Sequence, residues 1–292
     1  MTVIATIAFV ATMIGLVGFL ARRPQQAPRS GSREPSAKAE ALRKEMMRLA
    51  LPTVYLTDAE EPGHSKLGGT PELPEGMEWP TSAEGPMGLL VQIDLAAARE
   101  GGGPDWLPAT GTLYAFHDER WGFADQVRVI YAPDGPRVTV EPPFWLKKEW
   151  RYPERRVGFL QRQSIPSTDW LGIGPGVADL RDAVWDDIDA LSQPPGGQDR
   201  SHRLGGYPDE IQGDQMAVAS EYAIRGLERS YRDPVPPDIL EASAAWRLLL
   251  QVDSDEDLKM SWGDSGMIYV FIREQDARAG DFSRTVAISQ CF

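Results

Sequence analysis

The chain has 292 residues, of which 42% are hydrophobic and 25% are charged, the balance of an ordinary globular protein. Its net charge of −13 makes nucleic-acid binding by the body unexpected, because so acidic a surface repels phosphate backbones. Cys291 is the only cysteine, which excludes an intrachain disulfide and indicates a reducing compartment.

The first 21 residues predict a transmembrane anchor. Thr2 to Ala21 is an uncharged, almost wholly apolar run, long enough to cross a bilayer. A secretory signal peptide is the alternative, but it needs basic residues before the run and a small-x-small cleavage site, and neither is present. Four arginines follow the run, so the positive-inside rule predicts a single-pass protein of the cell membrane, with its N-terminus outside and its body in the cytoplasm.

A basic tether and a helix are predicted next, over residues 22–49. Residues 22–37 are rich in Pro, Ser, Gln and Arg, a composition typical of linkers. Ser36 to Leu51 has helical periodicity, with Ser36 as its cap and Pro52 as its stop. Residues 1–48 carry eight basic and three acidic side chains, so the remainder of the chain carries −18. That excess suits either a basic protein partner or simple solubility.

The first part of the body, from residue 50, is predicted to be mainly strands. The expected strands are Thr53–Leu56, Leu89–Ile93, Leu113–Phe116 and Val127–Tyr131, the last two antiparallel. Residues 66–80 contain three prolines and three glycines, which exclude a helix there. Asp94 is expected to open a short Ala-rich helix.

The middle of the chain has two interpretations. Residues 141–170 are rich in proline and aromatic residues, which indicates either an exposed recognition surface or a connection that packs its aromatic side chains onto the core. A helix is predicted over Val177–Leu191, from apolar residues repeating on one face.

The last part of the body completes an α+β prediction. A helix is expected over Asp214–Tyr231, and strands over Trp246–Val252, Met267–Ile272 and Thr285–Ile288. The predicted class is α+β, with mixed or antiparallel sheets and helices packed against them.

Three short blocks occur twice in the same order and predict an internal duplication. Residues 66–72 return as 203–209, 89–94 as 248–253, and 111–116 as 266–271. We therefore expect one domain over residues 50–292, built from related halves of about 50–135 and 200–292, with the Pro- and aromatic-rich connection between them.

The same blocks resemble the YwqG-like family, a group of bacterial domains of unknown function. The resemblance covers roughly residues 50 to 292, and its markers are Gly68-Gly69-Thr70-Pro71, Gln92-Ile93-Asp94, Gly206-Tyr207-Pro208, Gln251-Val252-Asp253, and Trp262-Gly263-Asp264. It implies an α+β fold with duplicated halves. It brings no catalytic residues, and relatives of this type are suspected of toxin-immunity or other protein-interaction roles.

The repeated polar residues are the main ligand-binding candidates. Gln92 and Asp94 share one face of a strand, as do Gln251 and Asp253, so the two faces could meet in a cleft. The candidate residues are Gln92, Asp94, Gln251, Asp253, Trp262 and Asp264. The structural alternative is that both aspartates cap helices and both glutamines satisfy backbone groups.

No metal site or cofactor is predicted. Residues 253–264 imitate a calcium-binding loop, but Leu258 stands where that loop needs glycine. The three histidines are not at metal-ligand spacing, and Gly172–Gly176 lacks the lysine of a phosphate-binding loop.

The sequence favours two functions and leaves a purely structural role at the membrane as a third. The first is a membrane-anchored cytoplasmic binding module, which takes a basic protein in an immunity-like role, or a small polar ligand. The second is a hydrolase or transferase that uses carboxylates such as Asp94, Asp253 and Asp264 between the two halves.

Overall fold

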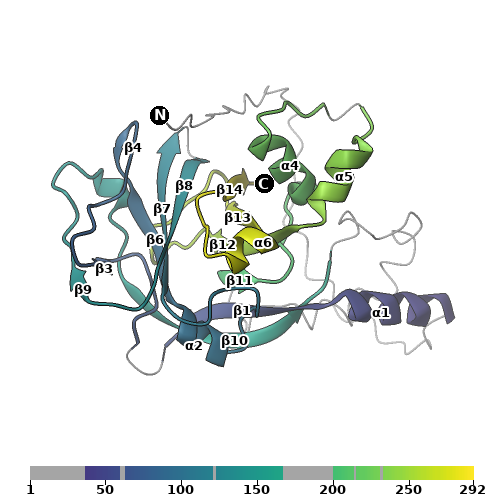
Figure 1. Ribbon diagram of the computed structural model, residues 1–292, viewed down its shortest axis with the longest axis horizontal. Helices are drawn as coiled ribbons and strands as arrows, with labels where there is room; N and C mark the ends of the chain where they lie inside the picture. Colours follow the sequence, from purple (N-terminus) through teal and green to yellow (C-terminus); the bar gives the residue numbers. More distant parts are fainter. Residues whose placement is uncertain (1–36, 60–62, 121–122, 167–199, 214, 231–232) are drawn as a thin grey trace.

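The computed structural model describes residues 37–292 except 60–62, 121–122, 167–199, 214 and 231–232 (Figure 1). The predicted anchor at Thr2–Ala21, the linker after it and the predicted helix at Val177–Leu191 lie outside the described residues. Among the helices that are described, none combines the length and the apolar character needed to span a bilayer.

A single ten-stranded antiparallel sheet forms the body. Its order is β14-β13-β12-β11-β1-β10-β2-β6-β7-β8. The strands are β1 (Leu51–Asp58), β2 (Lys66–Leu67), β6 (Gly88–Asp94), β7 (Thr112–Arg120), β8 (Phe123–Ala132), β10 (Arg155–Ser164), β11 (Arg203–Gly205), β12 (Trp246–Asp253), β13 (Met267–Arg273) and β14 (Val286–Gln290). The end strands β8 and β14 contact each other, so the sheet curls until it is nearly closed.

The remaining described elements are small. Two-stranded ribbons join β3 (Glu72–Pro74) to β9 (Arg137–Thr139) and β4 (Thr81–Ser82) to β5 (Gly85–Pro86). The helices are α1 (Ala37–Leu49), α2 (Leu95–Glu100), α4 (Met216–Ile224), α5 (Pro237–Ser243) and α6 (Glu274–Arg278), with a 3₁₀ turn, η1 (Lys148–Trp150). Figure 1 shows α1 projecting from one end of the molecule, and α4 and α5 beside each other.

The predicted α+β class is therefore wrong, because the protein is mostly β. The helix expected over Asp214–Tyr231 is one reason: α4 ends at Ile224. Gly226 follows with φ of 67°, the left-handed conformation that commonly closes a helix. The second reason is β10, which lies inside the stretch predicted as a connection and occupies the middle of the sheet.

The two halves of the repeat occupy equivalent places in the sheet. Strands β2, β6, β7 and β8 lie on one side in that order, and β11, β12, β13 and β14 lie on the other. The register also repeats, since Gln92 faces Tyr114 as Gln251 faces Tyr269. Both β6 and β12 carry a bulge at the same repeat position, between Leu89 and Val91 and between Leu248 and Leu250.

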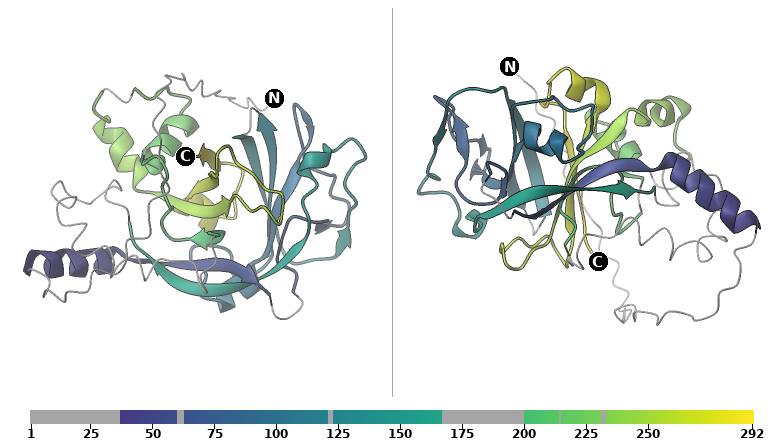
Figure 2. Two further views of the ribbon diagram at one scale, coloured as in Figure 1. Left: turned by 180° about the vertical axis from the view of Figure 1, so that it is seen from behind. Right: turned by 90° about the horizontal axis from the view of Figure 1, so that it is seen from below.

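The halves exchange their first strands. β1 precedes β2 in sequence, but it pairs with β11 of the second half, with Val54 opposite Leu204. β10 precedes β11 in sequence, but it pairs with β2 of the first half, with Arg156 opposite Lys66. β1 and β10 pair with each other between them, and both run beneath the two halves (Figure 2). The strand that flanks β2 is therefore the one that precedes β11 in sequence, and the strand that flanks β11 is the one that precedes β2.

Backbone conformation and close packing explain why each repeat block contains a Gly-Gly pair. Gly68 and Gly69 have positive φ angles of 59° and 72°, and Gly205 and Gly206 have 74° and 76°. Only glycine adopts this region readily. A Cβ atom on Gly68 would also collide with the backbone of Pro153. The glycines let the chain leave β2 and β11 sharply and pass close to its neighbours.

One continuous apolar core joins the halves. It contains Leu90 and Ile93 from β6 together with Leu250 and Val252 from β12, all fully buried. Trp262, from the loop after β12, belongs to the same cluster. The space between the two halves is thus filled by packed side chains.

Candidate functional site

Gln92 lies at the centre of the first of two polar clusters. Its side chain is fully buried. Its Oε1 accepts the backbone N–H of Glu72 at 2.8 Å, and its Nε2 donates to the carbonyl of His64 at 2.7 Å. Both contacts join β6 to the chain on either side of the Gly68-Gly69 turn. The amide therefore closes that turn and is not available to a ligand.

Gln251 does the same in the second cluster. It is also fully buried. Its Oε1 accepts the backbone N–H of Asp209 at 2.9 Å, and its Nε2 donates to the carbonyl of Ser201 at 2.9 Å. Asp209 and Ser201 are the repeat equivalents of Glu72 and His64. The same pair of glutamine hydrogen bonds, here called the glutamine lock, therefore occurs in both halves.

A tyrosine and a buried cation complete each cluster. The Tyr114 hydroxyl donates to the Glu72 carbonyl, and the Tyr269 hydroxyl donates to the Asp209 carbonyl, both at 2.5 Å. Lys66, 2% exposed, forms an ion pair with Glu154 at 3.0 Å, and Arg203, 1% exposed, forms one with Asp209. Burial raises the pKa of Tyr269, so its hydroxyl keeps its proton and remains a donor.

The two predicted aspartates have separate structural roles. Asp94 caps α2, where its carboxylate accepts the N–H groups of Ala96 and Ala97 at 2.9 and 3.1 Å. Asp253 caps no described helix; its carboxylate accepts the N–H of Ser201 at 2.8 Å instead. Burial raises the pKa of Asp253, but its hydrogen bond to Ser201 and the nearby His202 oppose that rise.

Trp262 and Asp264 do not join these clusters. Trp262 is buried, and its indole N–H donates to the carbonyl of Asp253 at 3.1 Å. Asp264 is exposed, and its carbonyl accepts the N–H of Phe292 at 3.1 Å. Of the six candidates, the structure brings Gln251 and Asp253 together at Ser201, with Trp262 contacting only the Asp253 carbonyl. Gln92 and Asp94 lie in the other half, and Asp264 lies at the surface.

A buried histidine joins the halves. His117, on β7, is fully buried, and its Nε2 lies 2.6 Å from the hydroxyl of Tyr152. Its ring centroid is 5.1 Å from that of Trp262 and 5.6 Å from that of Trp150. Burial lowers the pKa of His117 to about 3, so it is neutral at neutral pH.

An ion network surrounds Asp255, which the sequence presented as part of a calcium-like loop. Its side chain is fully buried and pairs with Arg155, with Arg200 at 3.4 Å and with His202 at 3.2 Å. Burial alone would raise the pKa of Asp255, but His202 and Arg155 hold it well below its usual range. Within the described ranges, no three His, Cys, Asp or Glu side chains form a group that could hold a metal ion.

We expect Asp255→Asn to destabilise the protein by about 2 kcal/mol at pH 7, because it removes the buried anion that pairs with the partly buried guanidinium groups of Arg155 and Arg200. Since the folded pKa of Asp255 lies below the unfolded value, its contribution is full above about pH 4 and is lost as pH falls below that. The deficit of the variant should therefore shrink in acid. Urea unfolding at several pH values measures it.

Asp257→Asn is the matched control for that prediction. Asp257 belongs to the same network, through Arg200 and Arg155, but its side chain is 66% exposed. Exposed ion pairs contribute little, so this variant should lose less than about 0.5 kcal/mol. Equal losses in the two variants would contradict the role assigned to Asp255.

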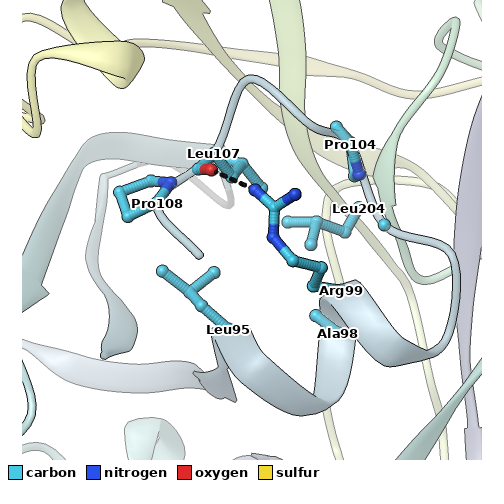
Figure 3. Close-up of a pocket in the computed structure, with 8 residues that line it drawn as sticks. Leu95, Ala98, Arg99, Pro104, Leu107, Pro108 and Leu204 are labelled. Carbon is cyan, nitrogen blue, oxygen red and sulfur yellow. Dashed lines mark hydrogen bonds between the residues drawn. The ribbon is translucent and has the colours of Figure 1, made fainter. Parts of the chain in front are cut away.

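A shallow hollow lies between α2 and the loop that follows it (Figure 3). Leu95, Ala98, Pro104, Leu107 and Leu204 line it, and Arg99 crosses it with its guanidinium donating to the Leu107 carbonyl at 2.8 Å. Its empty volume is about 170 Å³. It is too small for a substrate.

The main exposed apolar feature in the described chain is a loop of residues 141–151, here named the aromatic loop. Phe144 is 86% exposed and Trp145 is 61% exposed, and their rings meet edge to face with centroids 4.7 Å apart. Leu146 and Trp150 are buried beneath them. In the described part of residues 141–170, two aromatic residues therefore project and others are buried, so the stretch is partly packed onto the core; its use as a recognition surface stays a prediction.

Arg151 holds the aromatic loop in shape. Its guanidinium donates to the carbonyls of Pro143 at 2.8 Å, Phe144 at 3.0 Å and Leu146 at 3.3 Å. Three bonds from one planar group fix the backbone on both sides of the exposed pair. The sequence indicated this surface only by its composition, because nothing local shows which aromatic residues turn outward.

These observations define a mostly β protein of two related, strand-exchanged halves, whose repeated polar residues hold the fold together. The chain belongs to the family described as "Domain of unknown function (DUF1963)", and the match spans residues 65–291. A comparison with curated proteins gave no match.

Proposed function

We propose that this protein is a binding module that acts through its surface and takes a basic protein as its partner. The observation that supports this most is the use of Gln92, Asp94, Gln251 and Asp253 within the fold, each hydrogen-bonded to the protein's own backbone. With a continuous core between the halves, binding falls to the outer surface. Residues 49–292 carry −18, which favours a basic partner through electrostatic steering.

The finer resemblance to YwqG-like domains belongs to this proposal. It adds a protein-interaction role of the immunity type, in which an acidic surface neutralises a basic effector. A location at the cytoplasmic face of the membrane, through Thr2–Ala21, also stays a prediction.

Crosslinking in cells, followed by purification of the full chain, tests the proposal. The expected result is repeated recovery of a basic protein, whose binding to the purified chain weakens as salt rises, because the attraction is electrostatic. Recovery of no recurrent partner, or of acidic partners whose binding ignores salt, would contradict it.

The enzyme alternative rests on Asp253, the most buried of its carboxylates, at 7% exposure. A substrate screen should be repeated with Asp253→Asn and with Gln163→Ala, an exposed position on β10. An activity that only Asp253→Asn abolishes, in a protein that remains folded, would favour the enzyme.

A further inference from the structure

The aromatic loop is built to present Phe144 and Trp145 outward. Leu146 and Trp150 fix it from below and Arg151 fixes its backbone, so the exposure of the pair is a feature of an ordered loop. Exposed large apolar side chains of this kind, held together, mark an interaction surface. Arg151 reduces the entropy that the loop would lose on binding.

Lysines accompany the aromatic pair. Lys147 and Lys148 follow it directly and are exposed. The ammonium of Lys147 lies 4.0 Å from the ring centroid of Trp150, a cation–π contact at the base of the loop. Residues 141–151 carry three basic and two acidic side chains, whereas residues 49–292 as a whole carry −18.

We propose that the aromatic loop binds the surface of an anionic lipid bilayer. Phe144 and Trp145 enter the interfacial region, where amphipathic aromatic rings are favoured, and Lys147 and Lys148 face the headgroups. Each lysine near an anionic surface adds about 1 kcal/mol of attraction. The acidic remainder of the body is repelled by the same surface, so this loop is the part that touches first.

This contact is separate from the predicted anchor, and the two are geometrically compatible. β9, which leads into the aromatic loop, lies at the end of the molecule opposite α1 (Figure 1). The 15 residues between the predicted anchor and α1 can span at most about 50 Å. The predicted tether leaves the orientation of the body free, so the body can lie along the bilayer and turn the loop toward the same surface.

The test uses the full chain reconstituted into vesicles that contain bromine-labelled lipids, which quench tryptophan emission on contact. The vesicles are phosphatidylcholine alone or phosphatidylcholine mixed with phosphatidylglycerol. Wild type is compared with Trp145→Phe, so that the difference in quenching reports position 145 alone, whatever residues 2–21 do.

The expected result is a quenching difference that appears in the anionic vesicles and falls at least about twofold when Lys147 and Lys148 are both replaced by Glu. Phe144→Ser with Trp145→Ser should abolish the contact between the aromatic loop and the vesicle surface. It should not change the melting temperature, because both side chains are exposed. No quenching difference in either vesicle would overturn the proposal. If the double serine variant instead loses a crosslinked protein partner, the loop binds protein and the lipid proposal fails.

Discussion

Replacing His117 by Phe should flatten the fall in stability between pH 6.5 and pH 4. The folded pKa of His117 is about 3, whereas an unfolded histidine has a pKa of about 6.5. Between these values the unfolded chain binds a proton that the folded chain does not, so stability falls as pH falls. The slope is about 1.4 kcal/mol per pH unit, or about 3 kcal/mol between pH 6.5 and 4.

The structure gives this prediction a matched control. Trp150 packs against His117 and is 3% exposed, but it does not titrate. Trp150→Phe should lower stability by a similar amount at every pH and leave the slope as it is. His117→Phe should lower the free energy of unfolding by about 1 kcal/mol at pH 7, because it removes the hydrogen bond to Tyr152. In acid, the stability of this variant should rise relative to that of the wild type. Parallel curves for wild type and His117→Phe in urea unfolding would show that His117 is protonated in the folded protein.

His117 also lies where side chains from both halves and from the segment between them meet. It lies on β7 of the first half, Trp262 belongs to the second, and Trp150 and Tyr152 come from the segment between them. Protonation of this one ring in acid would place a charge at the centre of the junction. We therefore expect acid unfolding to involve both halves together, as the exchange of β1 and β10 also implies.

Local patterns in the sequence predicted the strands well, but not the class. Leu89–Ile93 and Trp246–Val252 are apolar runs bounded by clear breaks, and they are the cores of β6 and β12. β10 begins with Arg155-Arg156 and alternates poorly, so its position in the middle of the sheet comes from pairing with β1 and β2, strands distant in sequence. A long-range pairing of that kind leaves little trace in a local pattern.

The sequence likewise predicted some features of the candidate residues and missed others. The repeat identified Gln92 and Gln251 as equivalent, and the structural alternative of satisfied backbone groups describes what both do. The Ala-rich run after Asp94 correctly predicted that this residue caps a helix. The burial of Lys66 and Arg203 was not predicted, although a basic residue stands at the first position of both repeat blocks. Their carboxylate partners Glu154 and Asp209 become apparent only in three dimensions.

Removing either repeated glutamine should strongly destabilise the protein. Gln251→Ala leaves the N–H of Asp209 and the carbonyl of Ser201 without their partner and opens a cavity beside Arg203. Gln92→Ala does the same to Glu72 and His64. Each buried polar group that loses its partner costs about 1–3 kcal/mol, so we expect losses of about 4 kcal/mol for Gln251→Ala and about 3 kcal/mol for Gln92→Ala.

The double variant decides whether the duplicated locks act independently. Gln92 and Gln251 lie on β6 and β12, five strand steps apart along the sheet, and their hydrogen bonds go to different partners, so the two losses should add. Gln163→Ala, at an exposed position on β10, should cost less than about 0.5 kcal/mol and calibrates the loss of a glutamine side chain. Because each lock closes the Gly-Gly turn beside an exchanged strand, a loss well below the sum would show that opening one turn already releases the other, and that the halves fold as a single coupled unit.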